Sequence, residues 1–288
     1  MSEVMDRLVF TYPQLSLPIQ SGQSESEAYR RIVRKGVLPE KPENSFPGSD
    51  SDSVTLRQTP AGCVEVIRLG RRSDFIRAVQ ALAYRCEPVE IPDSMGAVTI
   101  SGVVNWRKIQ RHKTQWTAAH PEENWPAEFR RFTSQPDNYR DCLLFVSEGP
   151  YSAYPAQAAG YAPDLWLEAS LTIRSDHEIT HWICRRLWKE HQHAIRDEIV
   201  ADCIGLLSAF GAYDPDLAAR LLGLEPEGYR EGGRLQNYVQ GSLPSPELLE
   251  KVRQQISLLS ALQPERFTDP FAFLAEIENN NIGLELWT

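Results

Sequence analysis

The sequence has no long apolar segment, few cysteines and no excess of positive charge. No uninterrupted hydrophobic run approaches the ~18 residues of a membrane-spanning helix, and the first residues lack the basic and then apolar regions of a secretory signal peptide. The five cysteines are an odd number and are scattered, which argues against a disulfide framework. These absences predict a cytoplasmic protein without a membrane partner.

Other classes of function are also disfavoured. Lys and Arg total 30 against 39 Asp and Glu, and the resulting formal net charge of -9 disfavours a general nucleic-acid-binding protein. We interpret the basic, tryptophan-containing stretch at residues 106–116 as structural. The chain also has no visible repeat and no glycine-rich phosphate-binding loop. The sequence therefore predicts no nucleic-acid partner, and it does not indicate an oligomeric state.

Length and composition predict one large domain or two closely packed ones. With 288 residues, of which 42% are hydrophobic, the chain can bury a substantial core. Residues 1–58 are rich in Pro, Gly, Ser and Asp, which predicts an irregular N-terminal segment with a short helix near residues 27–35. Residues 59–162 are expected to form a sheet-bearing α/β part, and residues 163–288 a helical part that carries the functional site.

Short aliphatic runs predict the strands of a small mixed sheet. These runs are Val64–Leu69, Val98–Ile100 and Cys142–Val146. Between the first two, Ser73 is a candidate N-cap for a helix with an apolar stripe. The last strand runs into a loop that contains Tyr151 and Tyr154. The sheet is thus expected in the N-terminal half.

Helices are expected to dominate after residue 163. A long helix should begin near Asp164, and a second should run from Ala194 to Phe210 and end at Gly211, a typical left-handed cap. Three later helices each start with a cap residue followed by proline, namely Asp214–Pro215, Ser245–Pro246 and Asp269–Pro270. The predicted fold class is α+β, with a mainly helical C-terminal half around a helical hairpin.

The first of these helices carries the pattern His177-Glu178-Ile179-Thr180-His181. Histidines four apart share one helix face, close enough for both imidazoles to bind one metal ion. Glu178 points roughly 100° away, where it can flank the ion. Two nitrogen ligands, an open position for water and a carboxylate base are the parts of a hydrolytic zinc site. A third ligand would distinguish this site from a surface helix with two ordinary histidines.

Glu198 and Asp202, again four apart, supply that candidate on the next predicted helix. The residue numbers of His181 and Glu198 have the same sum as those of His177 and Asp202, so one turn centred at residues 189–190 sets both pairs level in an antiparallel hairpin. We therefore predict Glu198 as the third ligand and Asp202 as the acceptor of the second ring N–H of His177. The alternative is two solvated carboxylates, but the nearly all-apolar helix argues for burial.

At these residues the chain resembles the gluzincin branch of zinc metallopeptidases, whose pattern is HExxH followed by ExxxD on the next helix. The resemblance implies a zincin-like fold with Zn²⁺ held by His177, His181 and Glu198. It also implies Glu178 as general base and Asp202 as a support for the ligands. The expected function is a zinc-dependent hydrolase, most simply a metallopeptidase that cleaves an amide bond in a peptide or small amide substrate.

A further donor is needed to stabilise the oxyanion of such a reaction. The segment 229–238 mixes phenols, guanidiniums and two glycines in what is expected to be a loop leading to a short helix. Arg234 and Tyr238, four apart, would face the site together if that helix forms, and they are predicted catalytic residues. Tyr151 and Tyr154 are weaker candidates. The alternative is a surface loop with incidental arginines.

Two other functions are compatible with the same residues. A catalytically silent, zincin-like binding or regulatory module would keep the zinc or the fold without turnover. A carboxylate-bridged di-iron protein is the other, because Glu178 and His181 also form a Glu-x-x-His pair. Its second pair, Glu190 and His193, falls on the predicted turn and not on a facing helix, so the bundle geometry is missing.

Overall fold

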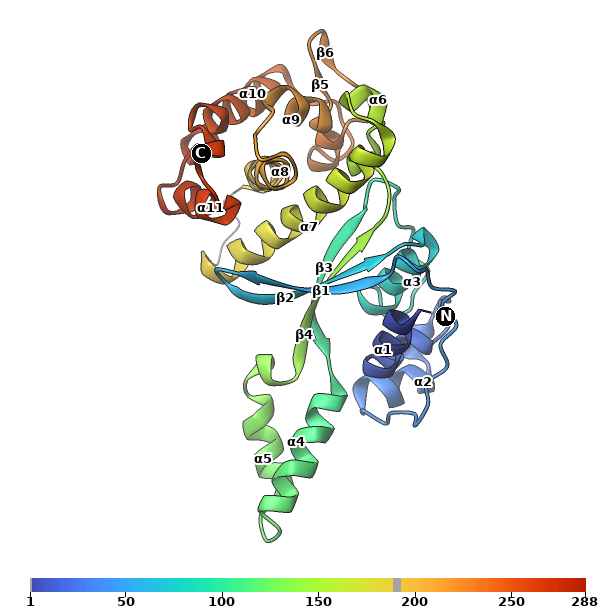
Figure 1. Ribbon diagram of the computed structural model, residues 1–288. Helices are drawn as coiled ribbons and strands as arrows, with labels where there is room; N and C mark the ends of the chain where they lie inside the picture. The colour runs from blue at the N-terminus through green and yellow to red at the C-terminus, as the bar shows by residue number, and fades with distance from the viewer. Residues whose placement is uncertain (1, 189–192) are drawn as a thin grey trace. The chain divides into compact units, whose positions relative to one another are not determined.

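A computed structural model describes residues 2–188 and 193–288 and confirms a mixture of helices with a small sheet (Figure 1). It contains two compact units. The first comprises Met1–Leu56, Glu65–Pro92 and Val98–Ser147. The second comprises Arg57–Val64, Asp93–Ala97 and Glu148–Thr288. Among the described helices, none is both long enough and apolar enough to cross a membrane.

The sheet has four strands in the order β1-β2-β4-β3. Strands β1 (Ser53–Thr59) and β2 (Gly62–Leu69) are joined by so few residues that they must be antiparallel. Strand β2 runs parallel to β4 (Arg140–Ser147), and β3 (Ala97–Val104) forms the other edge. The sheet is therefore mixed, as predicted. Strand β1 was not predicted, because it is an edge strand without a buried side chain and so lacks an apolar alternation.

The described part of the first unit has five α-helices. They are α1 (Glu3–Thr11), α2 (Glu27–Tyr29), α3 (Arg72–Leu82), α4 (Trp106–Ala119) and α5 (Trp125–Thr133). Helix α1 lies in the segment expected to be irregular, and it is held by buried Met5, Leu8 and Val9. Helix α3 begins before Ser73, which is therefore not its cap. The predicted short helix exists as α2 and a π-helical turn at Arg30–Arg34.

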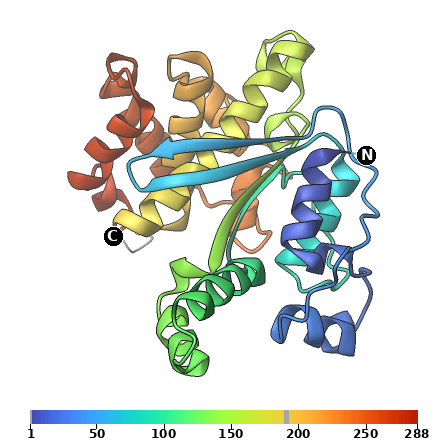
Figure 2. The same ribbon diagram turned by 60° about the horizontal axis from the view of Figure 1, so that its bottom comes forward.

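The basic stretch singled out in the sequence forms helix α4. Helices α4 and α5 form the connection from strand β3 to strand β4 along the chain, and they lie side by side (Figures 1 and 2). Their contact is aromatic: the ring of His112 stacks on Phe132 at 4.1 Å, and Trp116 meets Trp125 at 6.0 Å between ring centroids. This packing agrees with a structural role for the stretch.

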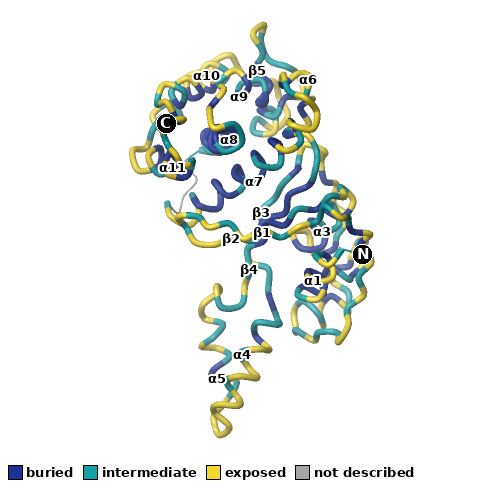
Figure 3. Tube along the Cα trace, in the orientation of Figure 1, coloured by how far each residue is buried: buried dark blue, intermediate teal, exposed yellow. Residues whose placement is uncertain are grey.

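The second unit is mainly helical and surrounds helix α8. Its helices are α6 (Ala156–Ala159), α7 (Pro163–Leu187), α8 (Ala194–Phe210), α9 (Pro215–Leu222), α10 (Pro246–Ala261) and α11 (Pro270–Asn279), with a short hairpin of β5 (Leu224–Glu225) and β6 (Gly228–Tyr229). Helix α8 contacts α7, α9, α10 and α11, and it is the most buried of them (Figures 1 and 3). An almost wholly apolar helix is stable only in such a position.

Local sequence signals explain where these helices start and stop. Asp214, Ser245 and Asp269 each accept hydrogen bonds from backbone N–H groups in the first turn of the helix that follows. Gly211 ends α8 with a left-handed φ of 69°. All four predictions are confirmed, because each depends on residues adjacent in sequence.

Close packing of α7 against α8 depends on a glycine. A Cβ atom added to Gly205 in α8 would lie 2.8 Å from the carbonyl oxygen of Ile173 in α7 and 3.0 Å from its Cγ2. A backbone oxygen cannot move aside as a flexible side chain can. Ile173 is one turn before His177, so this contact sets the spacing of the two helices beside the predicted site.

Gly205→Ala should therefore lower the free energy of unfolding by about 1–3 kcal/mol, the usual cost of overpacking. Urea denaturation of the metal-free protein measures this change. Helix propensity alone favours alanine by about 1 kcal/mol. An increase in stability of that size would show that the two backbones are not in contact.

Candidate metal centre

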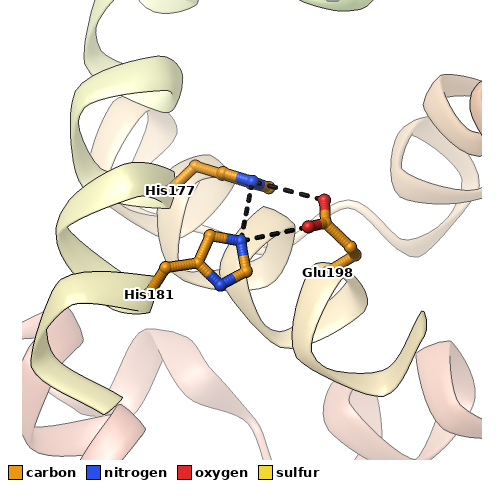
Figure 4. Close-up of side chains that lie close together, drawn as sticks. All are labelled: His177, His181 and Glu198. Carbon is orange, nitrogen blue, oxygen red and sulfur yellow. Dashed lines mark hydrogen bonds and ion pairs between the residues drawn. The ribbon is translucent and has the colours of Figure 1, made fainter. Parts of the chain in front are cut away.

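Helices α7 and α8 bring the predicted metal ligands together. His181 of α7 faces Glu198 of α8 at 3.2 Å (Figure 4). His177 of α7 faces Asp202 of α8 at 2.9 Å. These are the two level pairs that an antiparallel hairpin predicts. The turn predicted at residues 189–190 lies outside the described part of the chain. The helical register on either side of that turn is therefore sufficient to align both pairs.

Three donor atoms converge on one point. The Nε2 atoms of His177 and His181 are 3.1 Å apart, and the carboxylate of Glu198 lies 3.4 Å from the first and 3.2 Å from the second (Figure 4). Ligands at ~2.0–2.2 Å around a tetrahedral Zn²⁺ are about 3.3 Å from one another. Within the described residues, this is the group of His, Cys, Asp and Glu side chains whose donor atoms could hold one ion. Its donors are those that zinc prefers.

The electrostatics of the cluster also favour a cation. Burial alone would lower the pKa of His177, but the carboxylates of Glu198 and Asp202 raise it to about 10. Burial would raise the pKa of Glu198, but its contacts with His177 and His181 hold it well below its usual range. In the metal-free protein a proton on His177 thus balances buried negative charge. A bound divalent ion would take over that role.

Asp202 binds Nδ1 of His177, the ring nitrogen that is not predicted to bind the metal ion. The Nδ1–H of His177 donates to Oδ1 of Asp202 at 2.9 Å, so Nε2 is the nitrogen at the convergence point and offers its lone pair once its proton has left. Only 1% of the Asp202 side chain is exposed. Burial favours its neutral form, but the guanidinium of Arg234 keeps the pKa of this carboxyl below its usual value. The contact predicted for Asp202 is therefore present.

The predicted short helix at the end of segment 229–238 forms as a 3₁₀-helix, Arg234–Tyr238. The hydroxyl of Tyr238 donates to Glu198, and burial together with that carboxylate raises the pKa of the phenol. The guanidinium of Arg234 instead binds Asp202, the hydroxyl of Tyr151 at 2.8 Å and Oγ of Ser152 at 3.0 Å. These contacts favour a supporting role for Arg234 over the predicted role at an oxyanion.

Tyr151 is a central residue that the sequence marked only as a weak candidate. Its hydroxyl donates to Oδ1 of Asp202 at 2.5 Å and lies 3.0 Å from Nδ1 of His177. Tyr154 lies elsewhere, with its ring 4.9 Å beneath the guanidinium of Arg230. Tyr151 follows strand β4 and has no fixed spacing from the histidine motif, so the sequence carries no signal that would place it here.

Glu178, His193 and Glu190 are the remaining residues that the sequence singled out. Glu178 is half-buried on α7 between the two histidine ligands. His193 stacks on Trp287 with ring centroids 4.5 Å apart, and burial lowers its pKa. Glu190, the other half of the di-iron pair, lies outside the described residues. Within the described residues, the converging donors His177, His181 and Glu198 could hold one ion.

Comparison with known proteins identifies a family without an assigned activity. The profile described as "Family of unknown function (DUF7005)" matches residues 1–282 of the chain. No curated protein matches the chain, and no solved structure matches it. The functional interpretation therefore depends on the site itself.

Proposed function

We propose that this chain, which belongs to the DUF7005 family of unknown function, is a zinc-dependent hydrolase that cleaves an amide bond in a peptide or small amide. The observation that carries the proposal is the convergence of His177, His181 and Glu198, with donor atoms 3.1–3.4 Å apart. Glu178, which follows His177 on α7 and is half-buried, supplies the carboxylate that hydrolysis needs. The paired helices that carry these residues support a zincin-like arrangement.

Each side chain of the site would have its own role in such a reaction. When bound to His177, His181 and Glu198, Zn²⁺ would supply Lewis-acid chemistry, which lowers the pKa of water toward ~7 and polarises a carbonyl group. Glu178 would take a proton from the attacking water and return it to the leaving amine. Tyr238, whose hydroxyl donates to Glu198 in the metal-free protein, would be the neutral donor for an oxyanion once that hydrogen bond is released.

The cysteines support a reducing location for this enzyme. All five are free thiols, and Cys86 and Cys203 are buried. Burial raises the pKa of both thiols, which keeps them protonated and unreactive. We therefore place the reaction in the cytoplasm.

Metal content and activity test the proposal together. The purified protein should contain about one zinc per chain, as a single three-ligand centre requires. It should cleave members of a fluorogenic peptide library or a 4-nitroanilide, lose that activity on chelation and regain it with added zinc. A protein that remains metal-free after incubation with excess zinc would overturn the proposal.

Zinc binding should release about one proton per ion at pH 7.5, because the ligand must be neutral. The proton comes from His177, whose pKa in the metal-free fold is raised from 6.5 to about 10. Protonated His177 therefore stabilises the metal-free fold fully below pH 6.5, and this contribution is lost as the pH rises through about 10. Zinc affinity should correspondingly increase with pH over that range.

Titration calorimetry in buffers with different ionisation enthalpies counts the released proton. Equal binding heats in all buffers at pH 7.5 would show that His177 is already neutral. They would contradict the electrostatic account of the cluster.

A further inference from the structure

We propose that Tyr151 and Arg234 are positioning residues that set the affinity of the centre for its metal ion. They do so by holding Asp202 and, through it, the ring of His177. This inference rests on the proposed metal site, but it does not depend on hydrolysis. Neither residue belongs to the ExxxD or HExxH pattern.

Asp202, Tyr151 and Arg234 form a closed ring of hydrogen bonds, and His177 is attached to it through Asp202. Oδ1 of Asp202 accepts from Nδ1 of His177 at 2.9 Å and from the hydroxyl of Tyr151 at 2.5 Å. Oδ2 of Asp202 binds one terminal nitrogen of Arg234, and the other terminal nitrogen donates to the hydroxyl of Tyr151 at 2.8 Å. Rotation of the carboxylate would therefore disturb contacts with three partners at once. The ring of His177 is also restrained, because its Nδ1–H is hydrogen-bonded to this carboxylate.

Burial makes the restraint necessary. The side chains of Asp202 and Arg234 are 1% and 12% exposed, and Tyr151 is also buried. A buried polar atom without a hydrogen-bond partner is costly, so each oxygen of Asp202 needs a donor. Arg234 supplies one to Oδ2, and Tyr151 and His177 supply two to Oδ1. A histidine that donates to a fixed carboxylate is a better metal ligand in one defined tautomer.

The loop that presents Tyr151 has a backbone conformation that needs outside support. Ser152 and Ala153 both have left-handed φ angles, 52° and 54°, which are unfavourable for residues other than glycine. Oγ of Ser170 accepts the backbone N–H of Tyr151 at 2.8 Å, and Arg234 donates to Ser152. These contacts hold the loop in the conformation that places the phenol beside His177.

The segment that presents Arg234 is anchored in a comparable way. The hydroxyl of Tyr229 donates to the carbonyl of Gly233 at 2.7 Å and accepts the backbone N–H of Gln236 at 3.1 Å. A Cβ atom on Gly233 would lie 2.7 Å from that hydroxyl. The backbone on both sides of Arg234 is thus held in place before any metal binds.

Tyr151→Phe is the decisive variant, because it removes one hydroxyl and keeps the buried ring. The dissociation constant for zinc should rise roughly tenfold, the lower end of the effect of losing a group that supports a metal ligand. Competition with a chelator of known zinc affinity at fixed pH measures it. Tyr161→Phe is the matched control, since its ring stacks on Trp166 and Phe210, and it should keep the wild-type dissociation constant.

Arg234→Lys provides a second measurement and keeps the positive charge beside Asp202. An ammonium group cannot reach Asp202, Tyr151 and Ser152 together as the guanidinium fork does. Zinc binding should weaken roughly 10–100-fold, and the visible spectrum of the Co²⁺ form should change. The midpoint of thermal unfolding of each metal-free variant must be measured in parallel.

Three outcomes separate the possibilities. Weaker zinc binding in Tyr151→Phe and Arg234→Lys, with the control unchanged, supports the positioning role. Unchanged zinc binding with reduced stability of the metal-free protein shows a purely structural network and overturns it. Wild-type protein that binds no zinc overturns the proposed metal site instead.

Discussion

Glu178→Gln should reduce hydrolysis by about 10²–10⁴-fold, the usual contribution of a general base. The amide has nearly the shape of the carboxylate but cannot accept a proton from water. Because Glu178 is not one of the three converging ligands, the variant should retain the zinc content of the wild type. Turnover of a fluorogenic peptide and elemental analysis of the same preparation measure both quantities.

Glu168→Gln is the matched control for this experiment. Glu168 is exposed on the same helix α7, so its replacement should change neither zinc content nor turnover. Equal turnover in Glu178→Gln and the wild type would remove Glu178 from the mechanism. A zinc-containing wild type without detectable turnover would favour the alternative, a binding or regulatory module with a zincin-like site.

His177→Ala and Glu198→Ala should each abolish stoichiometric zinc binding. Two remaining ligands leave the ion largely hydrated, and the loss of either residue also leaves buried charge without a partner. Elemental analysis should show about one zinc per chain in the wild type and a small fraction of that in each variant. Excess zinc should also stop raising the unfolding midpoint of the variants. At 1,000 times the dissociation constant it stabilises a binding protein by about 4 kcal/mol.

Neighbouring carboxylates are not free to replace Glu198. Asp202 is held by His177 and Arg234, and Asp197 lies 3.4 Å from the guanidinium of Arg196. Asp197→Asn should therefore retain zinc and serves as the control on helix α8. Zinc retained by Glu198→Ala would transfer the third ligand to Asp197 or Asp202 and would contradict the proposed ligand set.

The ligand set could be predicted because it depends on helical periodicity alone. Residues four apart share a helix face, and equal sums of residue numbers identify level positions in an antiparallel pair. This reasoning placed His181 opposite Glu198 and His177 opposite Asp202, as the structure shows. It needed only the centre of the turn and not its conformation, because the spacing of both pairs is the same.

Features without a local signal were missed or misread. Helix α1 has no side-chain cap, and only the short apolar stripe of Met5, Leu8 and Val9 marks it in the sequence. Edge strand β1 has no buried face and so no apolar alternation. Arg234 was predicted to be catalytic because it is four residues from Tyr238 and would face the site with it. The structure shows its guanidinium engaged with Asp202, Tyr151 and Ser152. Such contacts depend on how distant loops pack, which helical spacing does not describe.

By itself, the order of residues determined the caps of three helices and the pairing of the histidines with the carboxylates. Each of these depends on groups within a few turns of one another. Only the tertiary structure decided that a phenol from residue 151 and a guanidinium from residue 234 close around Asp202. That arrangement exists because a buried carboxylate must have partners, and the chain can supply them from any segment that packs nearby.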